Sequence, residues 1–131
     1  MNSNPDIISI PSLSSVEITI TRLKSLLQER GITIYSHIDQ QSEAARSGLD
    51  LSPLQLLIFG SPGIGIPLMD ANPLSGLDLP LKVIVWEDDE KKVWLSYNKF
   101  NYIQKRFDLP SNLIQNLSRA ETILIKAVSL E

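Results

Sequence analysis

Residues 54–97 read LQLLIFGSPGIGIPLMDANPLSGLDLPLKVIVWEDDEKKVWLSY, and this stretch decides the fold more than any other part of the chain. It begins with an apolar run, Leu54–Phe59, and ends with two more, Leu79–Glu87 and Lys92–Tyr97, which carry both tryptophans. Apolar runs bounded by glycine, proline and aspartate are typical of buried strands joined by tightly specified loops. The stretch therefore predicts a strand, then a glycine- and proline-rich loop, then a two-stranded hairpin.

The hairpin has two interpretations. In its expected register, Trp86 faces Val93 and Trp94 faces Val85. Such pairs of an aromatic and a β-branched residue contribute roughly 0.2–1 kcal/mol each, so the tryptophans would serve the sheet alone. Alternatively, one or both tryptophans line a ligand cleft or a subunit contact, where aromatic residues are enriched.

Upstream, the chain predicts a strand followed by a helix. Ile7–Ile10 is β-branched, which favours a strand. Ser14 precedes Glu17 by three residues, the spacing of a capping box, so we expect a helix that begins after Ser14. Gly31 is typical of a helix end, because glycine readily adopts the left-handed conformation found there.

In the next segment apolar and polar residues alternate, and the residues that follow it predict a short helix. Over residues 32–38 the alternation predicts a strand that buries Ile34 and Ile38 on one face and turns His37 to the other. Asp39 is well placed to cap a helix that runs through Ala45.

After the hairpin, Asn98 can cap a helix over residues 99–107, and Ser111 begins a final helix. The element order is then β-α-β-α-β-β-β-α-α, in one domain over residues 1–131. This order predicts an α+β fold with two layers, in which one mostly antiparallel sheet packs against helices. A doubly wound parallel fold would need a helix between Phe59 and Leu79, where the composition predicts no more than a turn of one.

Composition narrows the function classes. The net charge is −3 and the basic residues are scattered, so we expect no nucleic-acid partner. Apolar runs stay far below the roughly 18 residues of a membrane span, and no export signal is apparent, so we expect a cytoplasmic protein without a membrane partner. The chain has no cysteine, which removes disulfides, thiolate nucleophiles and cysteine-bound metals.

The glycine-rich loop has a phosphate-binding spacing without the phosphate-binding residues. Gly60 and Gly65 match the glycine spacing of a P-loop, but Ile66 and Pro67 stand where lysine and a hydroxyl residue are needed. A dinucleotide fingerprint also fails, because Leu68 replaces its third glycine. The glycines either form a weak anion-binding nest or simply allow close approach of the backbone.

Three titratable residues invite a catalytic or metal-binding interpretation. Asp39 and Asp78 each lie where a strand meets a loop, and two such carboxylates can serve as general acid and base if the fold joins them. Otherwise Asp39 caps a helix and Asp78 stabilises a turn. His37 is the only histidine; with Met69 as a conceivable second haem ligand it makes a poor site, so we expect no metal and no cofactor.

The chain resembles the DUF302 family (domain of unknown function 302) from its first helix to about Leu109, and residues 110–131 are the least characteristic part. The resemblance rests on these pieces: Ile38-Asp39, Ala44-Ala45, Gly48, Pro53, Phe59-Gly60, Pro62, Gly65, Pro67-Leu68-Met69, Leu77-Asp78-Leu79-Pro80-Leu81, Trp86-Glu87, Val93-Trp94 and Tyr97. It implies a small α+β domain similar to the TBP-like two-layer arrangement, homodimers as in some members, and no established reaction. It also implies that Asp39, the glycine-rich loop and Asp78 converge on one pocket.

Two positions depart from the family pattern. Gln40 stands where the family usually has histidine, and an amide neither titrates nor binds metals well. Lys91 stands in the hairpin turn where glycine is common. A left-handed lysine there would cost on the order of 1–2 kcal/mol, so we expect a different turn type.

We therefore predict a non-catalytic homodimer that binds a small molecule or a partner between the glycine-rich loop and the hairpin. The candidate ligand-binding residues are Asp39, Gln40, Gly60, Gly63, Gly65, Met69, Asp78, Trp86 and Trp94. The alternatives are an enzyme that uses Asp39 and Asp78 as an acid–base pair, and a purely structural or interaction protein.

Overall fold

The apolar run at 54–60 forms the second strand from one edge of a five-stranded sheet. The computed structural model describes residues 4–129. Spatial order is β1-β5-β4-β3-β2, and every neighbouring pair runs antiparallel. The strands are β1 (Ile7–Ser12), β2 (Thr33–Asp39), β3 (Leu54–Gly60), β4 (Leu81–Glu87) and β5 (Val93–Asn98).

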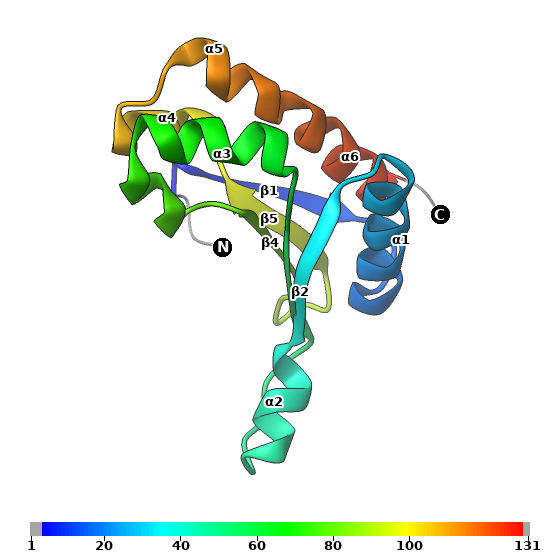
Figure 1. Ribbon diagram of the computed structural model, residues 1–131. Helices are drawn as coiled ribbons and strands as arrows, with labels where there is room; N and C mark the ends of the chain where they lie inside the picture. The colour runs from blue at the N-terminus through cyan, green and yellow to red at the C-terminus, as the bar shows by residue number, and fades with distance from the viewer. Residues whose placement is uncertain (1–3, 130–131) are drawn as a thin grey trace.

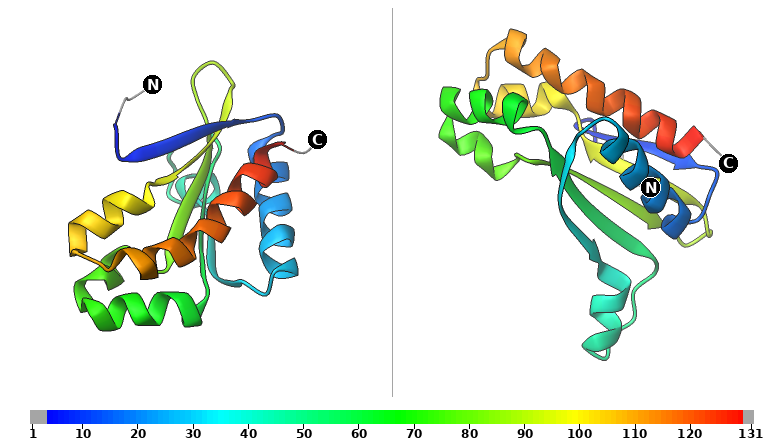
Figure 2. Two further views of the ribbon diagram at one scale, coloured as in Figure 1. Left: turned by 90° about the horizontal axis from the view of Figure 1, so that it is seen from above. Right: turned by 45° about the vertical axis from the view of Figure 1, so that its right-hand side comes forward.

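The longer helices lie on one side of this sheet, whereas α2 projects from one end of it (Figures 1 and 2). This arrangement confirms the predicted α+β fold with a helical layer on an antiparallel sheet. The helices are α1 (Val16–Glu29), α2 (Gln40–Arg46), α3 (Pro62–Ala71), α4 (Phe100–Phe107), α5 (Ser111–Ile114) and α6 (Ser118–Ser129), with 3₁₀ turns η1 (Pro73–Leu77) and η2 (Gln115–Leu117).

The core lies between the sheet and the helical layer. Every second residue of the central strands faces the helices, as with Leu57 in β3 and Val85 in β4, both fully buried. Leu23 and Leu27 of α1 and Leu124 of α6 meet them, and each is almost completely excluded from solvent. Burying a side chain of this size contributes about 1.5–3 kcal/mol, so this interface supplies most of the hydrophobic stabilisation.

The prediction of a loop after β3 was wrong, because residues 62–71 form α3. Pro62 occupies the first turn, where its fixed φ suits a helix and no N–H is missed. Pro67 lies inside the helix and Gly63 and Gly65 weaken it, so local propensity opposes the helix. Leu68 is fully buried in the core, and this tertiary contact compensates for the poor propensity.

The new helix does not make the sheet parallel. β3 and β4 still pair antiparallel, with Phe59 opposite Leu81 and Leu54 opposite Trp86. α3 and η1 therefore form a long connection between β3 and β4. It leaves the sheet and returns to it at the same end of this antiparallel pair. The exclusion of a doubly wound fold was right, although the argument from a missing helix was not.

Several helix ends differ by one position from prediction. Ser15, not Ser14, caps α1, and its Oγ accepts a hydrogen bond from the Ile18 N–H at 3.1 Å. α4 begins at Phe100 after Lys99, without a side-chain cap from Asn98. The predicted final helix is divided into α5, η2 and α6. The caps of α2 and the end of α1 agree with prediction, because Asp39 accepts from the Ser42 N–H and Gly31 has a φ of +70°.

A β-bulge changes which residues of β2 share a face. Ile34 pairs with Phe59 and Ser36 with Ile58, so Tyr35 is an extra residue on the bulged strand. Ile38 pairs with Leu56 and therefore lies on the face opposite the helices. The predicted common face for Ile34 and Ile38 was wrong, because one inserted residue reverses the alternation.

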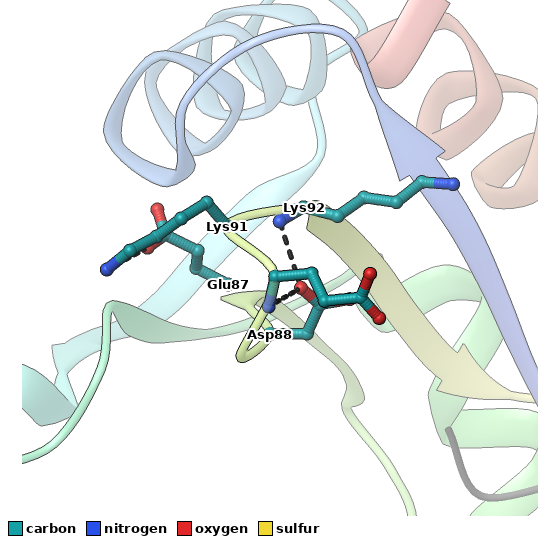
Figure 3. Close-up of polar contacts among 5 residues, drawn as sticks. Glu87, Asp88, Lys91 and Lys92 are labelled. Atoms are coloured by element: carbon teal, nitrogen blue, oxygen red, sulfur yellow. Dashed lines mark hydrogen bonds and ion pairs between the residues drawn. The ribbon is translucent and has the colours of Figure 1, made fainter.

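The hairpin register also differs from prediction. Trp86 pairs with Trp94 directly, and Glu87 pairs with Val93. The intervening turn is held by Asp88, whose Oδ1 accepts from the backbone N–H of Glu90 and of Lys92, both at 2.9 Å (Figure 3).

Lys91 lies in this turn with a φ of +67°, in the left-handed region. The expectation of a different turn type was therefore wrong, and this lysine keeps the conformation that favours glycine. Its ammonium lies 3.6 Å from Glu87 Oε1, an exposed pair that adds little to stability (Figure 3).

Candidate functional site

A cavity of about 430 Å³ opens between α3, α6 and the sheet edge formed by β2 and β3. This volume lies within the roughly 300–1,000 Å³ typical of small-molecule sites. Figure 2 shows α3 and α6 on the same side of the sheet. The cavity is lined by Arg30, Ile32, Tyr35, Phe59, Gly60, Ser61, Pro62, Ile64, Gly65, Ile66, Met69, Leu79, Pro80, Leu81, Asn116, Leu117, Arg119, Ala120, Thr122 and Ile123.

The lining is mainly apolar with a basic rim. Arg30 follows the end of α1 and Arg119 lies in the first turn of α6, and both side chains are exposed. Among residues 4–129 they are the only charged residues of the lining, and none of its residues in this range is aspartate or glutamate. Within the part of the chain that the structure describes, neither guanidinium group has an ion pair. The cavity therefore combines apolar walls with two available positive charges.

Gly65 of α3 leaves part of the cavity wall without a side chain. A Cβ at Gly65 would meet only Met69 Cε, at 3.8 Å, which is ordinary contact. A Cβ at Gly63 would meet nothing within 4 Å, and Gly63 is not part of the lining. Larger side chains at Gly65 would therefore enter the cavity without forcing the backbone to move.

The structure divides the predicted ligand-binding residues among different places. Gly60, Gly65 and Met69 lie on the cavity wall. The lining excludes Gly63 and also the remaining predicted residues, which are Asp39, Gln40, Asp78, Trp86 and Trp94. Their roles in binding stay predictions, but the suggested convergence on one pocket does not occur.

Asp39 and Asp78 lie toward opposite ends of the sheet. Asp39 pairs with Gln55 at one end of β3, whereas Asp78 precedes β4, whose first residue pairs with Phe59 at the other end. Four residues of strand separate these positions, or about 13 Å at roughly 3.3 Å per residue. An acid–base pair made of these two carboxylates is therefore ruled out by distance.

Each of these carboxylates is also occupied. Asp39 Oδ1 caps α2 by accepting from the Ser42 N–H at 3.1 Å. The two oxygens of Asp78 accept from Arg106 Nη1 at 3.1 and 3.0 Å. Both residues are thus used in holding local structure.

Both tryptophans lie on the sheet face that the helices leave bare. Trp86 Nε1 donates to Ser96 Oγ at 2.9 Å, and Ser96 Oγ is 2.7 Å from Ser9 Oγ across the next strand pair. Trp94 Nε1 donates to Asp88 Oδ2 at 2.9 Å. Because both indole N–H groups are already bonded, the rings offer apolar surface and no free donor.

The same face carries a continuous apolar patch, which we call the bare face. It comprises Ile38, Leu54, Leu56, Ile58, Ile84, Trp86 and Trp94, all only partly buried. The register places Ile84 beside Leu56 on one side and Ser96 on the other, so Ile84 lies near the middle. A patch of this kind is typical of a protein–protein contact.

His37 lies on the helix-covered side, at the exposed edge strand. Its Nδ1 is 3.3 Å from Lys24 Nζ, and its Nε2 is 2.6 Å from Gln55 Oε1. Because an ammonium group only donates, Nδ1 accepts and Nε2–H donates to the amide oxygen. Among residues 4–129, no group of three or more histidine, aspartate and glutamate side chains is placed to hold a metal.

Two groups have displaced pKa values. The hydrogen bonds from Trp94 and from the Lys92 backbone lower the pKa of Asp88 below its usual range. Burial, together with the hydrogen bond that Tyr97 donates to Glu121 Oε2 at 2.7 Å, raises the pKa of the Tyr97 phenol well above its usual range. Neither group lies in the cavity lining: Asp88 holds the hairpin turn, and Tyr97 links β5 to α6.

The residues that sequence reasoning missed are the basic ones. Arg30 and Arg119 are 89 positions apart, and no local motif joins them. Ala120 and Ile123 of α6 also line the cavity, and neither was predicted as a site residue. The only signal was the basic residue beside Gly31 at a helix end, which is a common position for arginine.

The protein is therefore a two-layer α+β domain. One helical layer packs on an antiparallel sheet, and a cavity lies under that layer. The family model "Domain of unknown function DUF302" matches residues 8–127, and the chain belongs to this family. The resemblance inferred from the sequence is thereby confirmed.

Three curated relatives are similar in sequence. The chain is 35% identical over 103 residues to "Fluoride-specific ion channel FluC 1" of Brucella suis biovar 1, covering 79% of this chain and 41% of that protein. "Fluoride-specific ion channel FluC 1" of Brucella abortus biovar 1 and "Fluoride-specific ion channel FluC 2" of Brucella melitensis biotype 1 are also 35% identical, with 38% of their length covered. The chain thus spans about two fifths of the length of the curated relatives it matches.

A solved structure shows the same fold. The crystal structure of an uncharacterized conserved DUF302 protein from Bacillus stearothermophilus aligns with a TM-score of 0.76 and 18% identity, covering 94% of this chain and 95% of that one.

Within residues 4–129, no helix is long and apolar enough to cross a membrane.

Proposed function

We propose that this chain is a non-catalytic module that binds a small molecule in the cavity between α3 and α6. The observation that carries the proposal is an apolar cavity of about 430 Å³ beneath the helical layer, with two arginines at its rim. Within the part of the chain that the structure describes, the lining contains no histidine or carboxylate that could act as a general base, which favours binding over acid–base chemistry.

The test is a thermal-shift screen of metabolites against the wild-type chain and a filled variant. A ligand present at 100 times its Kd should add about 2.7 kcal/mol to the free energy of unfolding. Gly65→Trp should abolish the shift while the far-UV circular dichroism stays unchanged, because the indole occupies the cavity. Gly63→Ala is the matched control, since it changes the same helix outside the lining and should leave the shift intact. A shift that survives Gly65→Trp would place the ligand elsewhere.

We also propose that the chain forms a homodimer through the bare face. The face is apolar, lies opposite the helices, and presents indole rings whose N–H groups are already bonded. A stable interface needs at least about 1,000 Å² of buried surface, and a five-stranded sheet face can provide it. Size-exclusion chromatography with light scattering should give twice the 14.6 kDa mass of the chain, and a monomer at micromolar concentration would contradict this proposal.

A second candidate role is connected with fluoride, and the observation that favours it is that all three Brucella relatives are named as fluoride-specific ion channels. In this alternative the chain is an interaction domain that acts beside a fluoride channel. If the domain responds to the ion itself, sodium fluoride should raise the melting temperature more than sodium chloride at equal ionic strength. Equal melting temperatures would leave no support for fluoride binding by the chain.

A further inference from the structure

We propose that the ligand of the cavity is an anionic amphiphile, with an apolar chain in the cavity and a carboxylate-type head paired with Arg30 and Arg119 at the rim. This inference rests on the proposed binding function and specifies the ligand class. It comes from three features of the site: the sign of its charge, the character of its walls and the direction of α3.

The charge of the lining is opposite to the charge of the chain. The whole chain has a net charge of −3, whereas the cavity lining, within the described residues, holds two arginines and no acidic residue. Arg30 and Arg119 come from helices far apart in the sequence, so the fold gathers them at this place. A local positive field in an acidic protein attracts an anion and repels a cation.

The walls select against a small hydrophilic anion. Apolar side chains come from several elements around the cavity: Phe59 of β3, Ile64 and Met69 of α3, Leu117 of η2 and Ile123 of α6. Apolar surface removed from water contributes about 25 cal/mol per Å², and only an apolar body can bury these walls. A free phosphate or acetate ion would reach the arginines and leave the walls wet.

The beginning of α3 adds to the positive field. Ser61 precedes the helix but makes no side-chain capping bond, and the first turn carries no acidic residue. Ser61 and Pro62 line the cavity, so the positive end of the helix dipole lies at its wall. This end supports an anion already favoured by the two arginines.

The experiment is calorimetric titration of the wild-type chain with three probes. Decanoate has both the chain and the anionic head, decyltrimethylammonium has the chain with the opposite charge, and acetate has the head alone. Decanoate should bind at least tenfold more tightly than decyltrimethylammonium, and acetate should give no measurable heat. Equal binding of the two ten-carbon probes would overturn the assignment of an anionic head.

Variants of the two arginines test where the anionic head group of decanoate binds. Arg30→Ala and Arg119→Ala should each weaken decanoate binding by roughly two- to fivefold, the range expected of exposed ion pairs, and the double variant should weaken it further. Lys126→Ala is the matched control, because this exposed lysine lies on α6 outside the lining and should leave the affinity unchanged. Unchanged decanoate affinity in the double variant would also overturn the proposal.

Failure of this inference can be separated from failure of the proposed function. Binding of decanoate that Gly65→Trp leaves unchanged would mean that decanoate binds outside the cavity, which contradicts the inference. If the wild-type chain binds both ten-carbon probes equally and Gly65→Trp abolishes both, the cavity binds apolar ligands without regard to charge. The proposed function then stands and the anionic class is wrong.

Discussion

The cavity and the bare face are both apolar, but they differ in shape and in polar groups. The cavity is concave and has at its rim two charged side chains that form no ion pair with any of residues 4–129. The bare face is the surface of a sheet, and its indole N–H groups are bonded to Ser96 and Asp88. A concave apolar surface with free polar groups can surround a small ligand, whereas a flat one with satisfied polar groups fits another protein surface.

This difference teaches that the aromatic residues of the hairpin do not mark the candidate ligand site. Trp86 and Trp94 are the most prominent aromatic residues of the sequence, yet they lie on the face away from the cavity. The cavity is lined instead by aliphatic side chains, the aromatic rings of Tyr35 and Phe59, two glycines and two arginines. Four changes should separate the two surfaces further.

The largest effect is expected from the anchor of the cavity wall. Leu68 of α3 is fully buried, and Leu68→Ala should lower the free energy of unfolding by about 2–5 kcal/mol, because it leaves a cavity in the core. Urea denaturation measures the loss. Leu74→Ala is the control, since that side chain is 65% exposed and should change stability by less than about 0.5 kcal/mol. A small effect at Leu68 would mean that α3 does not depend on this contact.

The next effect concerns the bare face. Ile84→Lys places a charge near its centre and should weaken the proposed dimer by about 2 kcal/mol or more, which is roughly a thirtyfold rise in dissociation constant. Light scattering across a dilution series measures this shift, and decanoate binding should be unaffected. Ile125→Lys, at a position 48% exposed on α6, should leave the dimer intact. If both variants behave alike, the bare face is not the interface.

A smaller effect lies in the turn that borders the bare face. Lys91→Gly removes the strain of a left-handed lysine, about 1–2 kcal/mol, and costs about 0.5–1 kcal/mol of added chain entropy. The net expectation is a gain of about 0.5–1 kcal/mol in the free energy of unfolding, measured by urea denaturation. Glu90→Gly should destabilise instead, because Glu90 has no positive φ. A loss at Lys91 would mean that its contact with Glu87 outweighs the strain.

The smallest effect is the pH dependence of the same turn. Asp88 has a lowered pKa in the folded chain, so its ionised form contributes stability above its unfolded pKa of about 3.9. That contribution is lost as the pH falls through the folded pKa. Thermal melts from pH 6 downward should show a steeper decline for the wild type than for Asp88→Asn. Parallel curves would contradict the role assigned to the carboxylate.

The sequence predicted much of the fold because local patterns reported it directly. The apolar runs of β4 and β5, the Asp39 cap and the glycine after α1 each depend on a few neighbouring residues, and each was confirmed. The two-layer antiparallel architecture followed from their order. These features are short-range, so the periodicity and capping chemistry of the chain are sufficient to predict them.

Predictions from the sequence were wrong where one inserted residue or one distant contact decides the local structure. Tyr35 enters β2 as a bulge and reverses the faces of Ile34 and Ile38. α3 forms from a glycine- and proline-rich segment because Leu68 is buried under the helical layer. Neither a bulge nor a buried contact leaves a local signature that outweighs composition.

The sequence by itself determined the strands, the Asp39 cap and the class of fold, since these follow from the chemistry of adjacent residues. Only the tertiary structure decided the candidate site. It brings Arg30, Gly65 and Arg119 to one cavity and leaves both tryptophans on the opposite face. The physical reason is that a cavity is bounded by residues distant along the chain, and their meeting depends on how whole helices pack on the sheet.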